Sequence, residues 1–359
     1  MNRLFCFAAA LAVSVLTVSF AAAQAADTAN GQSGDGAPIA SSDSNRTPDV
    51  SRGAPPPVRE DGEAKKAPGE PPIESRYFSD QPSRGYKGGT FVEVRPKAAY
   101  AFSSDLDFGG DFSVFRTGVN LKTEYWLERF LTLTFDANYE YSSYDFDGLP
   151  AAVPGDPLDE ANRISLRPGI RMALSREWLA FAGFAGTFSG ETGVDLEDGV
   201  TATGFLGGRY KWKPDVAFTL GIGVGNELED DVVAFPILGV KWDINDRWVL
   251  DIGGARGGFQ AAATYEINDQ WEATAALRFE ARDYRLDEDS PIPDGVLRDD
   301  RLAFVASATY KPTPWAEIIA SAGVVLVNDI TVEGSNGGEV FEESADPTPI
   351  LGLRGRIRF

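Results

Sequence analysis

Apolar and polar residues alternate along most of the chain, from Gly89 to Phe359. Over 131–141, apolar residues occupy every second position, and Thr, Asp, Asn and Glu fill the positions between them. The same period of two recurs over 163–174 and 271–280. Because successive side chains of a strand point to opposite faces, each segment predicts a β-strand with one apolar and one polar face. A soluble β-sandwich also shows this alternation, so further features must decide between water and lipid.

Short and long connections between the predicted strands alternate, which is typical of an outer-membrane barrel with short periplasmic turns. Six short turns and seven longer loops join 14 strands, so we predict an all-β, antiparallel, up-and-down transmembrane β-barrel with both ends of the chain in the periplasm. The weakest hairpin is 247–267, without which the barrel has 12 strands. The short turns lie near 126–129, 175–177, 213–215, 244–247, 268–270 and 311–314; the loops lie near 103–110, 144–160, 189–199, 226–232, 253–258, 285–300 and 327–348.

Every tryptophan of the chain lies in or within about three residues of a short turn. A β-sandwich gives no reason for tryptophan to collect at one end, whereas a boundary between lipid and water does, because the indole ring is amphipathic. We therefore predict that the tryptophans form a belt at the periplasmic rim of the barrel. They are Trp126, Trp178, Trp212, Trp242, Trp248, Trp271 and Trp315.

The final strand, 351–359, alternates up to its last residue, which is Phe359. It resembles the C-terminal recognition signal of bacterial outer-membrane barrels. The resemblance implies that Leu351, Leu353, Ile357 and Phe359 serve targeting by the barrel-assembly machinery and insertion into outer-membrane lipid.

The first 88 residues differ in character from the barrel. Residues 1–25 have one Arg, an apolar run and small residues at A-x-A spacing, which predicts a secretory signal peptide. Residues 26–88 are rich in Pro, Ser and Gly with few apolar residues, which predicts a disordered periplasmic tail. A passive linker is favoured over an arm that binds a periplasmic partner. The barrel domain is then 89–359.

Composition excludes several classes of function. The chain has no His and one Cys, which removes His-based catalysis and Cys-based metal sites, so we expect neither an enzyme nor a cofactor. A net charge of −21 disfavours nucleic acid as a partner. The seven loops hold 27 acidic and three basic residues. Pro291 interrupts the ligand pattern after 287–289, so a solvated acidic surface is favoured over bridging by divalent cations.

The polar face of the strands should line the lumen, because charges in lipid cost a few kcal/mol each. Barrel closure should place the basic row of the last strand beside the charged row of the first. One interpretation is a constriction that attracts anions. The other is a lumen braced by ion pairs, with Asp136, Glu140, Glu272, Glu280 and Glu317 as partners. The predicted lumen charges are Glu93, Arg95, Lys97, Arg163, Arg167, Arg171, Arg354, Arg356 and Arg358.

Residues 89–359 resemble bacterial outer-membrane β-barrels, and most of all the uncharacterised families known only as domains of unknown function. The 14-strand fatty-acid and hydrocarbon transporters share the strand count, but their apolar N-terminal hatch has no counterpart in the polar tail. We expect a passive pore or uptake channel for small hydrophilic solutes. The alternative is a structural or surface-display barrel with a filled lumen, which the segment 327–348 is long enough to enter.

Overall fold

The computed structural model describes residues 88–107, 109–149, 155–228, 232–335 and 337–359. The predicted signal peptide and the predicted tail up to residue 87 lie outside these residues. Within them the chain forms no helix, and thus none long and apolar enough to cross a membrane. The strands are β1 (Thr90–Asp105), β2 (Asp111–Glu128), β3 (Leu131–Asp147), β4 (Glu160–Ala173), β5 (Trp178–Glu191), β6 (Val200–Lys213), β7 (Val216–Gly225), β8 (Val233–Asp243), β9 (Trp248–Ala255), β10 (Gly258–Asn268), β11 (Trp271–Arg285), β12 (Val296–Thr313), β13 (Ala316–Glu333), β14 (Glu339–Ala345) and β15 (Thr348–Arg358).

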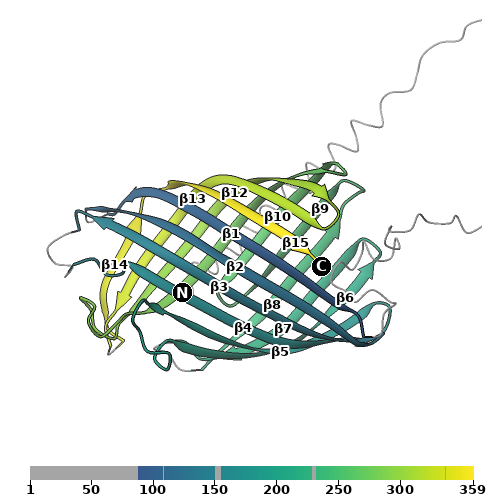
Figure 1. Ribbon diagram of the computed structural model, residues 1–359, viewed down its shortest axis with the longest axis horizontal. Coiled ribbons are helices and arrows are strands. Elements are labelled where there is room, and N and C mark those ends of the chain that lie inside the picture. Colours follow the sequence, from purple (N-terminus) through teal and green to yellow (C-terminus); the bar gives the residue numbers. More distant parts are fainter. Residues whose placement is uncertain (1–87, 108, 150–154, 229–231, 336) are drawn as a thin grey trace, which may run out of the picture. The chain divides into compact units, whose positions relative to one another are not determined.

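The strands close into an antiparallel barrel (Figure 1). Each strand from β1 to β13 pairs with the next along the chain, and β15 pairs with both β13 and β1. β14 and β15 lie end to end, because β14 pairs with Asn328–Glu333 and β15 with Ala316–Val325 of the same strand, β13. The barrel therefore has 14 strands, as predicted. The hairpin 247–267 is present as β9 and β10, so the 12-strand alternative is wrong.

All six short turns lie at one end of the barrel, together with Thr90 and the C-terminus. We call this the near end and the opposite one the far end. Two connections at the far end differ from the longer loops that were predicted there. The 253–258 loop is a two-residue turn, in which Gly257 has a φ of 80°. The 327–348 segment continues the wall as the end of β13 and as β14, and these strands do not enter the lumen as the alternative allowed.

The outer face of the barrel exposes a wide apolar surface. Phe115, Leu133 and Phe135 are about 40% exposed, and Leu206, Leu220 and Leu353 more than half. On β2, β3 and β15, the positions that alternate with them carry charged side chains of the interior, such as Arg116, Asp136 and Arg354. An exposed apolar surface of this extent suits a lipid environment and not water.

The far end of the barrel is narrower than the near end. β10 pairs with β11 as far as Glu280, and beyond that point Arg285 of β11 pairs in parallel with Gly190 of β5. Leu106, directly after β1, bridges to Ala345 of β14. The far end is thus a smaller ring of nine strands, β1 to β5 and β11 to β14, which leaves out β6 to β10. A ring of about eight strands is narrow enough for side chains to fill, whereas 14 strands enclose a wider space.

Candidate functional site

A packed apolar core fills the ring at the far end. Its side chains come from the inner faces of β2 to β4 and β11 to β13 and from the connections at the far end, which include Leu106 directly after β1. Tyr284, Leu297 and Ile330 have no exposed surface. The members are Leu106, Phe112, Val114, Tyr144, Phe146, Leu158, Ala161, Tyr284, Leu286, Ile292, Leu297, Ile330 and Val332. We call this cluster the apolar plug, and it closes the barrel axis at the far end.

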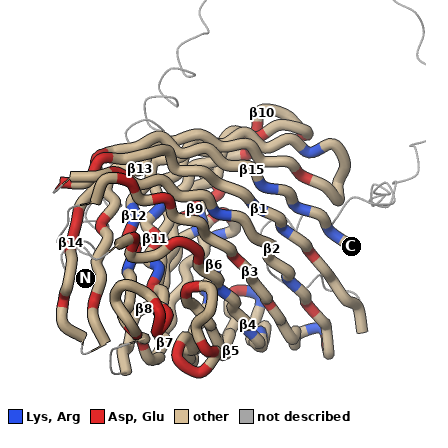
Figure 2. The backbone as a smooth tube through the Cα atoms, turned by 60° about the vertical axis from the view of Figure 1, so that its left-hand side comes forward, with Lys and Arg blue, Asp and Glu red and all other residues tan. Residues whose placement is uncertain are grey.

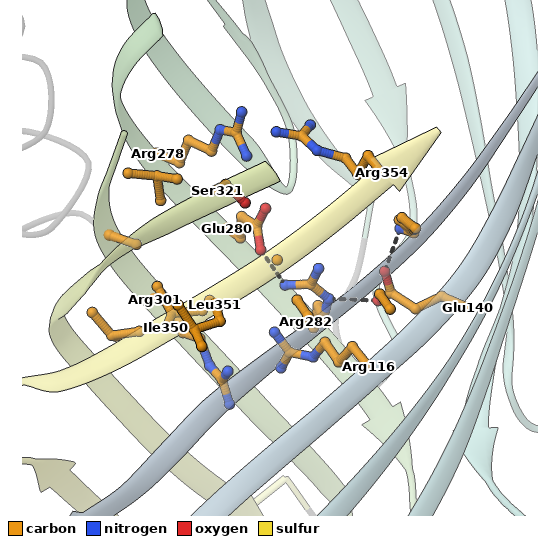
Figure 3. Close-up of a pocket in the computed structure, with 17 residues that line it drawn as sticks. Arg116, Glu140, Arg278, Glu280, Arg282, Arg301, Ser321, Ile350, Leu351 and Arg354 are labelled. Carbon is orange, nitrogen blue, oxygen red and sulfur yellow. Dashed lines mark hydrogen bonds and ion pairs between the residues drawn. The ribbon is translucent and has the colours of Figure 1, made fainter. Parts of the chain in front are cut away.

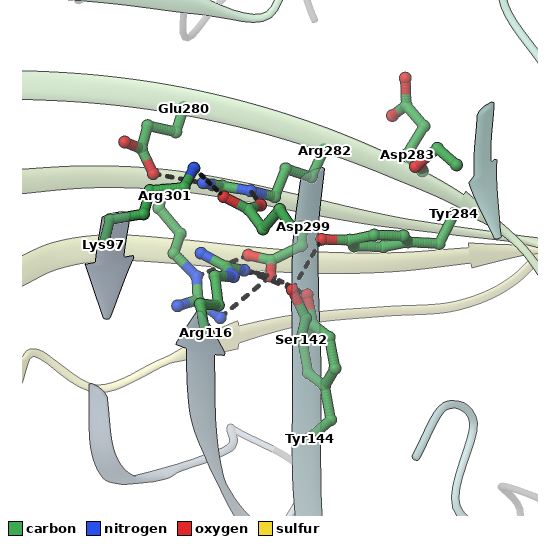
Figure 4. A network of polar contacts seen from close by, with 12 residues as sticks. Lys97, Arg116, Ser142, Tyr144, Glu280, Arg282, Asp283, Tyr284, Asp299 and Arg301 are labelled. Carbon is green, nitrogen blue, oxygen red and sulfur yellow. Dashed lines mark hydrogen bonds and ion pairs between the residues drawn. The ribbon is translucent and has the colours of Figure 1, made fainter. Parts of the chain in front are cut away.

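A buried ionic layer lies beneath the apolar plug (Figure 4). Asp299 on β12 is completely buried and accepts hydrogen bonds from the Tyr144 hydroxyl at 2.6 Å and from Arg301 Nε at 2.7 Å. Arg116 on β2 forms an ion pair with the same carboxylate and donates to the Tyr144 hydroxyl at 3.0 Å. Because β2 and β3 reach β12 here, the layer ties opposite walls of the barrel together. Each buried charge in it has a partner, as burial requires.

A second group of charges continues this layer toward the near end. Arg282 of β11 donates to Glu140 of β3 at 2.8 Å and to Glu280 at 2.7 Å. Lys97 of β1 also pairs with Glu140. Glu140 and Glu280 were both predicted as ion-pair partners from sequence. The group thus joins β11 to β1 and β3 on another part of the wall.

A cavity of about 230 Å³ adjoins these charges (Figure 3). We call it the chamber. Its lining includes two acidic side chains, Glu140 and Glu280, and an aliphatic patch of Ala303, Val305, Val325 and Ile350. Six basic side chains also line it, so the chamber carries an excess of positive charge. These are Lys97, Arg116, Arg278, Arg282, Arg301 and Arg354.

On the opposite wall, β5 to β8, the middle of the inner face is aromatic and rich in glycine, whereas charged residues such as Arg209 and Lys241 lie on the same face toward the near end. The rings of Phe205 and Phe235 lie against Gly183 and Gly223, where an added Cβ would clash with them. The glycines recurring every second residue over 221–225 fit the same arrangement, since at these positions they make room for neighbouring side chains. The interior thus has one charged side and one side whose middle is aromatic.

The charged rows of the first and last strands lie side by side on the inner face. Glu93 pairs with Arg358 in the β-ladder and Lys97 with Arg354, the juxtaposition that closure predicts. Glu93 accepts from Arg358 Nε at 2.9 Å and also pairs with Arg95, and Glu317 accepts from Arg356 at 2.7 Å. Arg95 and Arg358 are 41% and 36% exposed, so solvent reaches this part of the lumen. Near the first and last strands the arrangement is therefore a brace of ion pairs.

The third predicted row lies on the inner face of β4. Arg171 pairs with Glu124 of β2, which is also 3.0 Å from Lys122. Arg163 is opposite Glu140 in the ladder and Arg167 opposite Asp136. The row therefore belongs to the charged wall of the interior, but it does not line the chamber.

Six of the seven tryptophans lie on the outer face at the near end. Several of them pack against an aromatic ring of the neighbouring strand: Trp178 with Tyr210 at 4.6 Å, Trp271 with Tyr310 at 4.8 Å and Trp248 with Tyr265 at 4.9 Å between ring centroids. Trp212 and Trp315 are more than half exposed, and Trp242 packs against Leu250.

Trp126 departs from the predicted belt. It is on the same face of β2 as the buried Glu124, its indole nitrogen is buried, and Tyr125 and Leu127 are exposed on the other face. The strand period therefore directs Trp126 inward although its position in the chain is near a turn.

Residues of the last strand occupy the faces that their alternation predicts. Leu351, Leu353 and Phe359 are exposed outside, at 50%, 56% and 75%. Ile357 shares their face, while Arg354, Arg356 and Arg358 point inside.

Sequence reasoning missed the most buried part of the site. Asp299 was assigned to a loop, whereas β12 begins at Val296 and carries it inside. Charges stand on both faces of this strand over 298–301, which hides the period of two. The sequence pattern that could have revealed this strand is weaker: Leu297, Asp299 and Arg301 occupy every second position.

Acidic residues gather in the connections at the far end, as Figure 2 shows around β5, β7, β8 and β14. Among the residues that the structure describes, no three Asp, Glu or Cys side chains are close enough together to hold a metal ion. The acidic far end and the basic chamber thus have opposite charge.

The fold and the site define a class: a closed 14-strand β-barrel with an apolar exterior, a charged interior and a plugged far end. The chain belongs to a family described as a domain of unknown function, DUF6268, whose model matches residues 164–353. The sequence has no match among curated proteins.

Several solved structures are similar to the barrel. The COG4313 outer membrane channel from Pseudomonas putida F1 is 12% identical with a TM-score of 0.42, covering 77% of this chain and 97% of its own. The Pseudomonas putida toluene transporter TodX is 9% identical with a TM-score of 0.44, covering 79% and 93%. A Pseudomonas aeruginosa FadL homologue is 9% identical with a TM-score of 0.46, covering 79% and 94%.

Proposed function

We propose that the protein is an outer-membrane channel for small hydrophilic anions. The observation that carries the proposal is the chamber, which six basic and two acidic side chains line inside a closed barrel. Rings and clusters of basic side chains favour anions in a pore. The apolar exterior sits in lipid, the near end faces the periplasm, and the exposed apolar face of β15 serves recognition by the assembly machinery.

In this proposal, solutes enter or leave the barrel through its wall and not along the barrel axis. A second cavity, of about 300 Å³, lies where β10 and β11 separate at the turn of β9 and β10. It shares Arg278 and Glu280 with the chamber, and Phe259 and Phe279 from the outer face also line it. We call it the side cavity. Since the apolar plug occupies the far end, solutes pass between the chamber and the outside through the side cavity.

A structural barrel without transport is the second candidate, and the apolar plug is the observation that favours it. The two functions differ in flux through the folded protein. We would load the refolded barrel into liposomes and compare swelling rates in isotonic salts whose permeating ion is a small carboxylate or an ammonium ion of equal size. Faster swelling with the carboxylate is expected. Faster swelling with the ammonium ion would overturn anion selectivity, and no swelling with either would make the structural barrel the better account.

A further inference from the structure

Two arginines of the chamber differ from the others in lacking an acidic partner. Arg278 of β11 donates its Nε to the neutral amide oxygen of Gln260 at 2.9 Å. Within the described part of the chain, no carboxylate forms an ion pair with Arg278 or Arg354. The remaining bases of the chamber pair with Glu140, Glu280 or Asp299.

The two guanidinium groups come from separate strands and approach each other. In Figure 3, Arg278 reaches from β11 and Arg354 from β15, and their ends point toward one another at one end of the chamber, near Ser321. Two like charges that converge in a partly enclosed space repel unless an anion lies between them. Because the bond to Gln260 uses only Nε, the terminal nitrogens of Arg278 remain directed at the chamber. Guanidinium groups of this kind suit the two oxygens of a carboxylate.

The aliphatic patch lies directly beside these charges. Ala303 faces Arg278 across the ladder between β11 and β12, and Val325 faces Ala303 on the next strand. Val305 and Ile350 complete the patch, and all four side chains line the same cavity as the two arginines. The chamber thus joins a cationic end to an apolar surface within about 230 Å³. An inorganic oxyanion would contact only the cationic end, because it has no hydrocarbon part to pack on the apolar surface.

We propose that Arg278 and Arg354 bind the carboxylate of a small organic acid, and that the aliphatic patch contacts its hydrocarbon part. Gln260 positions Arg278 through the bond to Nε. The inference that such acids are transported rests on the proposed function. Their binding to the chamber does not require that the barrel conducts.

The test is calorimetric titration of the refolded barrel in detergent with butyrate. The matched probes are inorganic phosphate, which lacks the hydrocarbon part, and butanol, which lacks the charge. We expect butyrate to bind at least tenfold more tightly than phosphate, and butanol not to bind. Arg278→Gln and Arg354→Gln should each weaken butyrate binding tenfold or more. Arg278→Lys should weaken it by less, because it keeps the positive charge and loses only the paired donors of the planar guanidinium group.

Two further variants separate the site from general effects on the lumen. Lys311→Gln removes a base that pairs with Glu272 away from the chamber, and should leave butyrate binding unchanged. Val305→Thr keeps the volume of the patch but adds a hydroxyl, and should weaken butyrate binding without affecting acetate. Heat-dependent mobility on a gel establishes that each variant is folded.

The outcomes that overturn the proposal are distinct. Equal affinity for phosphate and butyrate would make the chamber a general oxyanion site. Unchanged butyrate affinity in both folded Arg→Gln variants would place binding elsewhere, and no binding by the folded wild-type barrel would exclude the site. If butyrate binds as expected while the liposomes show no flux, the site stands and the channel function fails.

Discussion

Asp299 is the residue on which the interior of the barrel depends most. Its carboxylate is completely buried, forms an ion pair with Arg116, and accepts hydrogen bonds from Arg301 and from the hydroxyl of Tyr144. Both guanidinium groups are themselves buried. Loss of the negative charge would leave two positive charges in a space from which water is excluded, and such uncompensated burial is costly.

We therefore expect Asp299→Asn to lower the free energy of unfolding by about 3–5 kcal/mol. The measurement is equilibrium unfolding in urea of the barrel refolded into lipid vesicles. The matched control is Glu288→Gln, since Glu288 is an exposed acid of the far end. An Asp299→Asn barrel as stable as the Glu288→Gln barrel would show that the buried ionic layer contributes little.

Single residues could be assigned to faces from sequence wherever one face of a strand was apolar. The period of two places Arg354, Arg356 and Arg358 inside and Leu351 and Leu353 outside, as the structure has them. It would also have placed Trp126 inside, but proximity to a turn outweighed the period. Which acid pairs with which base depends on contacts across the lumen, such as Arg282 with Glu140, and these leave no trace in a local pattern.

At the scale of elements, the separation of β10 and β11 sets the architecture of the site. It lets β11 meet β5, so that nine strands close around the apolar plug and the side cavity remains beside them. Sequence predicts the strands, their order and the near-end turns, because all of these follow from local alternation. The meeting of β5 and β11 is a contact between distant strands, so local alternation does not reveal it.

The side cavity can be tested by filling it. Gly253 on the inner face of β9 lines this cavity, and the nearest atom to an added Cβ is 3.5 Å away. We expect Gly253→Phe to reduce anion flux into liposomes at least severalfold, because the ring would occupy the passage. Gly204→Phe is the matched control, since an added Cβ there has no atom within 4 Å. Equal flux in the two folded variants would contradict passage through the side cavity.

At the scale of the whole molecule, one barrel combines a closed far end with a basic chamber. The 14 strands enclose more space than side chains can fill. Only at the far end, where the ring narrows to nine strands, do side chains fill the interior. The acidic connections and the basic chamber then give the barrel a charge asymmetry along its axis (Figure 2). This asymmetry and the apolar exterior both follow from the sequence, whereas the apolar plug does not, since its members come from six strands and the connections between them.

Single-channel conductance of the refolded barrel in a planar bilayer tests the central claim most directly. We would compare wild type with Tyr284→Ala/Leu297→Ala, which removes two buried side chains from the apolar plug, and with Leu353→Ala on the outer face as a control. We expect small, anion-selective conductance in wild type and in the control, and a severalfold larger conductance in the double variant. Equal conductance in all three folded barrels would contradict an axis closed by the apolar plug.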